Sequence, residues 1–223
     1  MEQVWLTQGK SENLLIFCNG WGMDQKPFSH LTSLEYDVLT LFDFRKLSLP
    51  LAITELHKRY ATLSLVSWSM GVWVGQTLFQ QSAGLFKRKV AINGTLCPID
   101  DLYGIPADNY AAVSQGFDLT SQIQFYKRMC RDRLTCTQFL QHQPERSIVS
   151  QAEELVALQE SCYNIPAKES IYDDIIVARS DYIMPTKNQL RFWGEGAVRI
   201  VDGYHYLFSR FSTWDEVVAE EKP

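Results

Sequence analysis

The strongest chemical signal in the sequence is a serine between an apolar segment and a helix-compatible one. Residues 63–71 are LSLVSWSMG, which places Ser69 in the pattern small-x-Ser-x-Gly. At a strand-to-helix junction this pattern is typical of a nucleophile elbow, in which a strained turn holds the serine hydroxyl out of the sheet. The tight turn requires small residues two before and two after the serine, and Ser67 and Gly71 satisfy this, although glycine is usual at the first position. The alternative interpretation is a serine that only caps the helix.

A serine hydroxyl is a weak nucleophile and needs a general base, which is nearly always histidine. The four histidines are His30, His57, His142 and His205. Proteins with a nucleophile elbow have the chain order nucleophile, acid, histidine, and this order excludes the first two. His142 lies in a segment without predicted strands, whereas His205 follows the last predicted strand, in the loop VDGYH. We therefore predict that His205 is the base.

The acid that orients the base is expected in the loop after the preceding strand. The apolar residues 175–178 are followed by RSDYIMP, which places Asp181 shortly after the strand end. Asp173 and Asp174 precede the same strand and belong to the opposite edge of the sheet. Asp202, three residues before the histidine, is the remaining rival, and we interpret it as a cap of its own loop. Asp181 is therefore the predicted acid, and it completes a serine–histidine–aspartate triad.

Acyl transfer also needs backbone N–H groups that stabilise the negative charge developing on the attacked carbonyl oxygen. The N–H of Met70, directly after the nucleophile, is expected to supply one of them. The second is expected from the loop after an early buried strand, where residues 17–22 are FCNGWG. Gly20 and Gly22 let this backbone turn sharply, so that the N–H of Trp21 can donate. The alternative interpretation is a plain glycine turn.

Seven short apolar segments, several of them continuous, predict strands that are buried on both faces of a sheet. They are residues 4–6, 14–18, 38–42, 63–66, 90–92, 175–178 and 198–201. Helix-compatible stretches lie at residues 26–34, 50–60, 70–83 and 207–221. Alternating strands and helices predict an α/β protein with a mostly parallel sheet and helices on both of its faces. The predicted site residues all follow strands, so the carboxyl edge of this sheet would bring them together.

One long stretch interrupts the alternation. Residues 97–170 contain no convincing strand but have amphipathic segments near 119–141 and 147–162, so we predict an inserted helical lid between two parts of a hydrolase core, 1–96 and 171–223. One apolar helical stripe is predicted to pack as core rather than to form a binding site, and its members are Leu119, Ile123, Tyr126 and Cys130.

Length and composition set the broad class. The 223 residues suit one domain, and the net charge of −5 argues against a nucleic-acid binder or a reader of anionic membranes. The five cysteines are scattered without a C-x-x-C pair, which favours a reduced compartment over a disulfide framework or a zinc site. No leader peptide and no apolar run of about 18 residues is visible. We therefore expect a cytoplasmic enzyme that needs no metal and no cofactor.

Three short blocks carry a resemblance to known proteins. They are NGWGMD at 19–24, SWSMGVW at 67–73 and DGYHYLF at 202–208. Over nearly the whole chain the sequence resembles the α/β-hydrolase superfamily, and in these blocks it is similar to the compact BioG type of pimeloyl-acyl-carrier protein methyl ester esterase, an enzyme of biotin synthesis. The resemblance implies hydrolysis of the methyl ester at the distal end of a carrier-bound pimeloyl chain, with release of methanol.

Two other functions share parts of this pattern. A general short-chain esterase or thioesterase would have the same triad and would differ only in its substrate. A non-catalytic binding protein of the hydrolase fold would usually lack a member of the triad, and all three members are present here.

A local excess of basic residues is relevant to the binding of an acyl-carrier protein. Between residues 120 and 147 the positive side chains outnumber the negative ones by three, and they are Lys127, Arg128, Arg131, Arg133 and Arg146. Lys127 and Arg131 are four residues apart and share one helix face. Acyl-carrier proteins are acidic and carry a phosphate on their prosthetic arm, so with the resemblance we predict that Lys127, Arg128 and Arg131 bind the carrier. The alternative is an ordinary solvated helix face.

Overall fold

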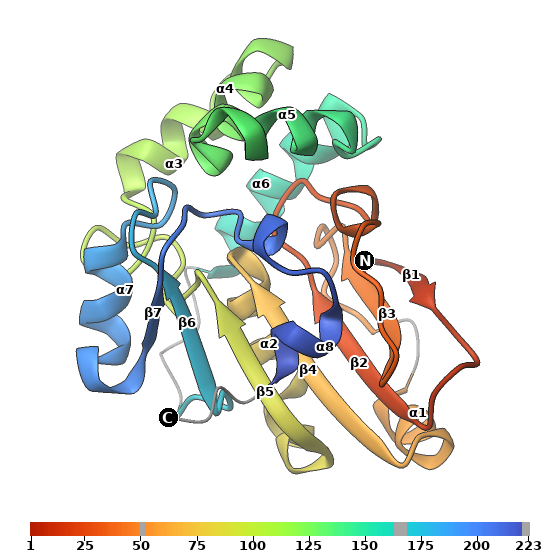
Figure 1. The fold of residues 1–223 in the computed structure, drawn as a ribbon. Coiled ribbons are helices and arrows are strands. Elements are labelled where there is room, and N and C mark those ends of the chain that lie inside the picture. The colour runs from red at the N-terminus through yellow and green to blue at the C-terminus, as the bar shows by residue number, and fades with distance from the viewer. Residues whose placement is uncertain (50–51, 163–168, 220–223) are drawn as a thin grey trace.

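The computed structural model describes residues 1–49, 52–162 and 169–219. Their centre is a seven-stranded sheet with the order β1-β3-β2-β4-β5-β6-β7 (Figure 1). The strands are β1 (Glu2–Thr7), β2 (Asn13–Cys18), β3 (Asp37–Phe42), β4 (Thr62–Trp68), β5 (Phe86–Ile92), β6 (Asp174–Ala178) and β7 (Arg199–Val201). Only β1 pairs antiparallel, with β3, and the other pairings are parallel. The predicted mostly parallel sheet is confirmed.

Both faces of the sheet are buried because alternate side chains of the same strands point into two separate cores. In β4, Leu63 and Leu65 belong to one core and Val66 and Trp68 to the other. Helices α1 (Ile53–Arg59) and α2 (Met70–Phe79) cover the first face. The short helices η1 (Lys26–Phe28), η4 (Phe208–Arg210) and α8 (Trp214–Val218) cover the second. This double burial explains why the strands are continuous apolar runs.

Four helices lie between β5 and β6, over one end of the sheet (Figure 1). They are α3 (Ala107–Ser114), α4 (Leu119–Cys130), α5 (Arg133–Gln141) and α6 (Ile148–Cys162). Asp118 caps α4 and Asp132 caps α5, each by accepting a backbone N–H three residues later. That residues 97–170 act as a separate lid stays a prediction, and positions 163–168 of that range lie outside the described residues.

Several predicted helices differ from the observed ones. The stretch 26–34 forms only η1, and 70–83 is divided into α2 and the 3-10 helix η2 (Gln80–Leu85). The amphipathic segment 119–141 is two helices, because Arg131 adopts a left-handed backbone with φ 62°. The stretch 207–221 forms η4 and α8, with its last two positions outside the described residues, as are positions 50 and 51 of the stretch 50–60.

The apolar stripe of α4 was predicted only in part. Tyr126 and Cys130 are buried, but Leu119 is 65% exposed and Ile123 is 41% exposed. The buried face of the helix instead includes Met129, next to Cys130, so it is rotated relative to the prediction. The spacing of apolar side chains does not show which side of a helix is buried, because the elements packed around the helix determine that side.

Two helices and two general features complete the description. The sequence did not indicate α3 or α7 (Thr186–Trp193), which are each eight residues long. All five cysteines carry free thiols. Among the helices of the described ranges, none has the length and apolarity needed to cross a membrane.

Candidate active site

Ser69 occupies a strained turn between β4 and α2. Its backbone has φ 57° and ψ −126°, a region that non-glycine residues seldom adopt and that costs about 1–3 kcal/mol. The turn is held by the Ser69 N–H, which donates to the Ile92 carbonyl at 2.9 Å. A Cβ at Gly71 would lie 2.3 Å from the carbonyl oxygens of Cys18 and Asn19, so only glycine lets α2 approach the end of β2. These are the features of a nucleophile elbow.

The same close packing explains the small residue at position 67. A Cβ on Gly75 would lie 2.5 Å from the Ser67 Oγ and 2.6 Å from the Tyr172 hydroxyl. The first turns of α2 therefore press against the last residues of β4, and a larger side chain at Ser67 would push them apart. Serine is small enough to fit at this position.

The three residues of the predicted triad come together. The His205 Nε2 lies 2.8 Å from the Ser69 Oγ, and the His205 Nδ1 lies 2.7 Å from the Asp181 Oδ2. An ionised carboxylate can only accept, so Nδ1 carries the proton and Nε2 accepts the hydrogen bond of the serine hydroxyl. All three side chains are buried, with Ser69 at 5%, Asp181 at 6% and His205 at 1% exposure. The arrangement suits general-base activation of the serine.

Asp181 is itself held by neighbouring groups. Its Oδ1 accepts the backbone N–H groups of Ile183 and Met184 at 2.8 and 3.0 Å, and its Oδ2 accepts the Gln189 side-chain amide at 2.9 Å. The rival Asp202 lies on the surface, where its side chain is 78% exposed and bonds the Arg179 guanidinium at 2.6 Å. This contact lowers the pKa of Asp202. The sequence analysis did not find Gln189, because it lies on the undetected helix α7.

Asn93 holds the histidine loop and was also missed. Its side-chain amide donates to the His205 carbonyl at 2.9 Å, and its Oδ1 accepts the Ala178 N–H at 2.7 Å. The Trp68 indole N–H donates to the same His205 carbonyl at 3.0 Å. Asn93 directly follows β5 with φ 47°, and Asn-Gly at the end of a buried strand is a signal that could have identified it.

The two predicted oxyanion donors belong to residues that share one cavity with Ser69. Trp21 and Met70 both line the cavity that contains the serine. Within the described ranges, neither backbone N–H donates to a protein acceptor. The Trp21 ring is fixed between Phe117 and Phe125, at centroid distances of 5.0 and 4.9 Å. Their role as oxyanion donors stays a prediction.

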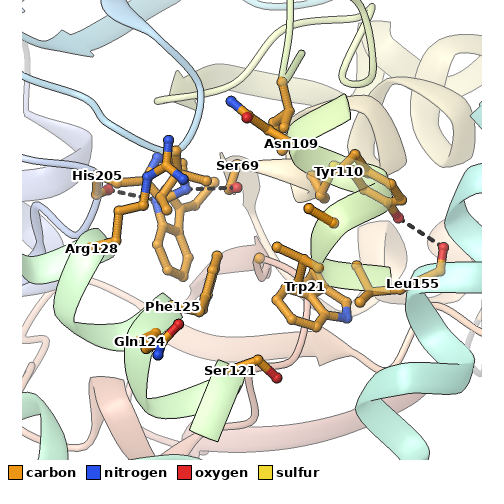
Figure 2. Close-up of a pocket in the computed structure, with 17 residues that line it drawn as sticks. Trp21, Ser69, Asn109, Tyr110, Ser121, Gln124, Phe125, Arg128, Leu155 and His205 are labelled. Carbon is orange, nitrogen blue, oxygen red and sulfur yellow. Dashed lines mark hydrogen bonds between the residues drawn. The ribbon is translucent and has the colours of Figure 1, made fainter. Parts of the chain in front are cut away.

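The cavity over Ser69 has a volume of about 290 Å³ and is mostly apolar (Figure 2). Its walls come from the carboxyl ends of the strands, from α3, α4 and α6, and from the loops around Trp21 and His205. Apolar side chains line most of it, among them Ile105, Tyr110, Val113, Phe125 and Leu155. Polar groups are contributed by Asn109, Ser121, Gln124 and Arg128. It suits an acyl chain with a polar group at one end.

The three basic residues of the predicted carrier site lie on α4 and directly after its C-terminal end, and all three are exposed. Lys127 is exposed on α4, and the Arg131 guanidinium lies 4.6 Å from the centre of the Tyr182 ring. Arg128 lines the cavity, and its Nε donates to the Tyr182 carbonyl at 2.8 Å. Including Arg146 in the surface cluster was wrong, because its side chain is only 7% exposed and is paired with Glu154 at 2.5 Å.

Comparison with known proteins gives a consistent result. The model of the family described as pimeloyl-ACP methyl esterase BioG matches residues 1–217. A protein of Bacteroides fragilis (strain 638R) named malonyl-acyl-carrier protein O-methyltransferase is 33% identical over 194 residues, which are 86% of this chain and 39% of that protein. The chain therefore spans well under half the length of this relative.

Solved structures agree with the family match. The crystal structure of BioG from Haemophilus influenzae matches with a TM-score of 0.89 and 27% identity, over 98% of this chain and 100% of that one. A peroxisomal α/β-hydrolase from Saccharomyces cerevisiae matches with a TM-score of 0.55 and 14% identity, over 96% of this chain and 76% of that one. The latter likeness concerns the fold alone. The predicted α/β-hydrolase fold is confirmed.

Proposed function

Since the chain belongs to the pimeloyl-ACP methyl esterase BioG family, whose model matches residues 1–217, we propose that it hydrolyses the methyl ester of pimeloyl-acyl-carrier protein in biotin synthesis. The products are pimeloyl-acyl-carrier protein and methanol. The single observation that carries the catalytic part of this proposal is the hydrogen-bonded chain from Ser69 through His205 to Asp181. The general class, a carboxylic ester hydrolase, follows from the family and the fold.

In the proposed mechanism Ser69 and His205 carry out both halves of the reaction. The Ser69 Oγ attacks the ester carbonyl while His205 Nε2 takes its proton, and the N–H groups of Trp21 and Met70 stabilise the oxyanion. Collapse breaks the bond to the methoxy group, which leaves as methanol with the proton from His205. A water molecule then attacks the acyl-enzyme, gives its proton to His205 and releases the acid, and the proton returns to Ser69. Asp181 orients the imidazole and stabilises its charged form.

The cavity supports a carrier-linked acyl substrate. Its apolar walls suit a methylene chain, and Arg128 is a cationic group that a phosphorylated prosthetic arm could contact. The name of the Bacteroides fragilis relative also refers to an acyl-carrier protein. Methyl transfer is not part of the proposal, because that name belongs to a protein of which this chain spans 39% and because the triad is built for acyl transfer.

The proposal is tested with pimeloyl-acyl-carrier protein methyl ester as substrate and mass spectrometry of the carrier. We expect the wild-type protein to remove the methyl group, and Ser69→Ala to lower kcat by roughly 10⁶ while the protein stays folded, as loss of a triad serine does elsewhere. A phosphonate should label wild type and not the variant. Substantial hydrolysis by the variant would remove Ser69 from the mechanism.

A second measurement separates the proposal from a general short-chain esterase. Such an enzyme would share the triad, so the two differ in the ratio of kcat/KM for the carrier-linked ester and for p-nitrophenyl butyrate. We expect a strong preference for the carrier-linked ester. Equal values for the two substrates would favour the general esterase.

A further inference from the structure

A buried carboxylate outside the triad contacts the loop that carries Trp21. Glu154 lies on α6 and is 0% exposed. Its Oε2 accepts the backbone N–H of Gly22 at 3.0 Å and the Arg146 guanidinium at 2.5 Å, and its Oε1 accepts the backbone N–H of Phe44 at 2.7 Å. Both oxygens are therefore occupied, and one of them holds the residue next to Trp21.

Helix α6 touches this loop at further points. The Trp21 indole N–H donates to the Gln151 carbonyl at 2.8 Å. Gly22 has φ 76°, and a Cβ there would lie 3.1 Å from the Gln151 Oε1. The loop has left the sheet at this point, so its conformation depends on the contacts that α6 supplies from one side and on the Asn19 side chain, which donates to the Asp24 carbonyl, from the other.

We propose that Glu154 is a positioning residue, which fixes the Gly22 N–H and thereby aims the neighbouring Trp21 N–H at the oxyanion. The inference rests on the proposed function, because it assumes that Trp21 acts as an oxyanion donor. Its consequence is that the helical segment between β5 and β6 forms part of the catalytic machinery and does more than cover the cavity.

The electrostatic environment of Glu154 is consistent with a role in positioning the loop. Burial raises the pKa of the Glu154 carboxyl, and the charge of Arg146 and the backbone N–H groups of Phe44 and Gly22 oppose that shift. A buried ion pair gives little net stability compared with apolar residues of the same size. A loop that is held in one conformation, however, needs short and directional hydrogen bonds, and a carboxylate can accept them.

The test is a pair of variants, of which one removes the acceptor oxygens and the other keeps one of them. Glu154→Met has similar volume but no acceptor, whereas Glu154→Gln keeps an amide oxygen for Gly22 and Arg146. With p-nitrophenyl butyrate we expect Glu154→Met to lower kcat roughly 10- to 100-fold, below the 10²–10³ lost when an oxyanion donor itself is removed, with KM nearly unchanged. Glu154→Gln should recover most of that loss. The exposed neighbour Glu153, changed to Met, is the matched control and should keep wild-type kcat.

A boronic acid that forms a tetrahedral adduct with Ser69 gives an independent reading. Its affinity for Glu154→Met should fall by the same factor as kcat, because the adduct carries the oxyanion. If affinity and kcat of Glu154→Met both match wild type, the inference is overturned.

Instability is separated from positioning with a double variant. Glu154→Met alone leaves the Arg146 charge poorly paired and can lower the melting temperature, whereas the combination of Arg146→Met and Glu154→Met removes both charges. We expect the double variant to regain stability but not kcat. Recovery of kcat together with stability would show a purely structural role and overturn the inference. If the wild-type protein neither hydrolyses esters nor reacts with a phosphonate, the proposed function fails, and this inference fails with it.

Discussion

The two imidazole nitrogens of His205 need different hydrogen-bond partners. The Nδ1–H needs an acceptor, which Asp181 provides at 2.7 Å, and the Nε2 must then be free to accept from Ser69 at 2.8 Å. An asparagine at position 181 can present its amide N–H groups to Nδ1 and stabilise the wrong tautomer. We therefore expect Asp181→Asn to lower kcat by about 10⁴, as in other triads.

Asp202→Asn is the control for this prediction. The Asp202 side chain is 78% exposed and pairs with Arg179 on the surface, so the substitution should leave kcat close to that of the wild type. Both variants are to be compared under single-turnover conditions with the same ester. The reverse ranking would place the acid in the loop before the histidine.

At the residue scale, chain order and strand ends were enough to select three residues whose side chains form one hydrogen-bonded chain in the structure. Ser69, Asp181 and His205 each follow a strand of the sheet, β4, β6 and β7 respectively, and parallel strands bring their carboxyl ends together. The sequence could not reveal Glu154 or Arg146 as a buried pair. A charged residue on an amphipathic segment looks the same in the sequence whether its side chain faces solvent or contacts a loop more than a hundred residues away.

At the element scale, the strands were predicted well because burial on both faces leaves a continuous apolar run. The helices between β5 and β6 were predicted less well. Their apolar residues are divided between the sheet, the cavity and solvent, so no single stripe marks the buried face. Arg131, whose left-handed backbone ends α4, has no sequence signal of the kind that glycine gives.

The start of β3 offers a test at this scale. The Asp37 carboxylate accepts the backbone N–H groups of Gly9, Lys10 and Ser11 at 2.7, 2.9 and 3.2 Å, and the Tyr60 hydroxyl at 2.9 Å. Burial alone would raise the pKa of Asp37, but these hydrogen bonds outweigh it and lower the pKa. We expect Asp37→Asn to reduce the free energy of unfolding at pH 7 by about 1–3 kcal/mol.

The direction of this pKa shift determines how the stabilisation by Asp37 changes with pH. Because the folded-state pKa of Asp37 is depressed, the stabilisation is complete above the unfolded pKa of about 3.9 and is lost as the pH falls through the folded pKa. Urea unfolding at a series of pH values should therefore show the gap between wild type and Asp37→Asn closing in acid. The exposed Glu12, changed to Gln, should show no such gap. A gap that stays constant with pH would mean that the carboxylate charge is not responsible.

At the scale of the whole molecule, the proposed approach of an acidic carrier depends on charge. The chain has a net charge of −5, yet Lys127 lies on α4, which lines the cavity, and Arg131 directly follows this helix. For the double variant Lys127→Glu/Arg131→Glu we expect a KM about tenfold higher for the carrier-linked ester and a weaker salt dependence, because long-range attraction to an acidic partner is lost. Hydrolysis of p-nitrophenyl butyrate should stay nearly constant.

Lys87 is the control for this prediction. It is exposed at the start of β5, at the opposite edge of the sheet from Ser69, so Lys87→Glu changes the net charge without changing the approach to the cavity. If all variants raise KM equally, total charge rather than the α4 surface governs docking. Arg128 is left unchanged because it also lines the cavity.

The positions of the site residues along the chain also determine when each of them is synthesised. The nucleophile and its base are separated by 136 residues. At a synthesis rate of 5–20 residues per second, the serine is made about 7 to 27 s before the histidine. When Ser69 is made, the nascent chain contains β1 to β4, and β5, β6 and β7 are synthesised during that interval, before His205. A chain that terminates before residue 205 therefore contains Ser69 without its proposed base.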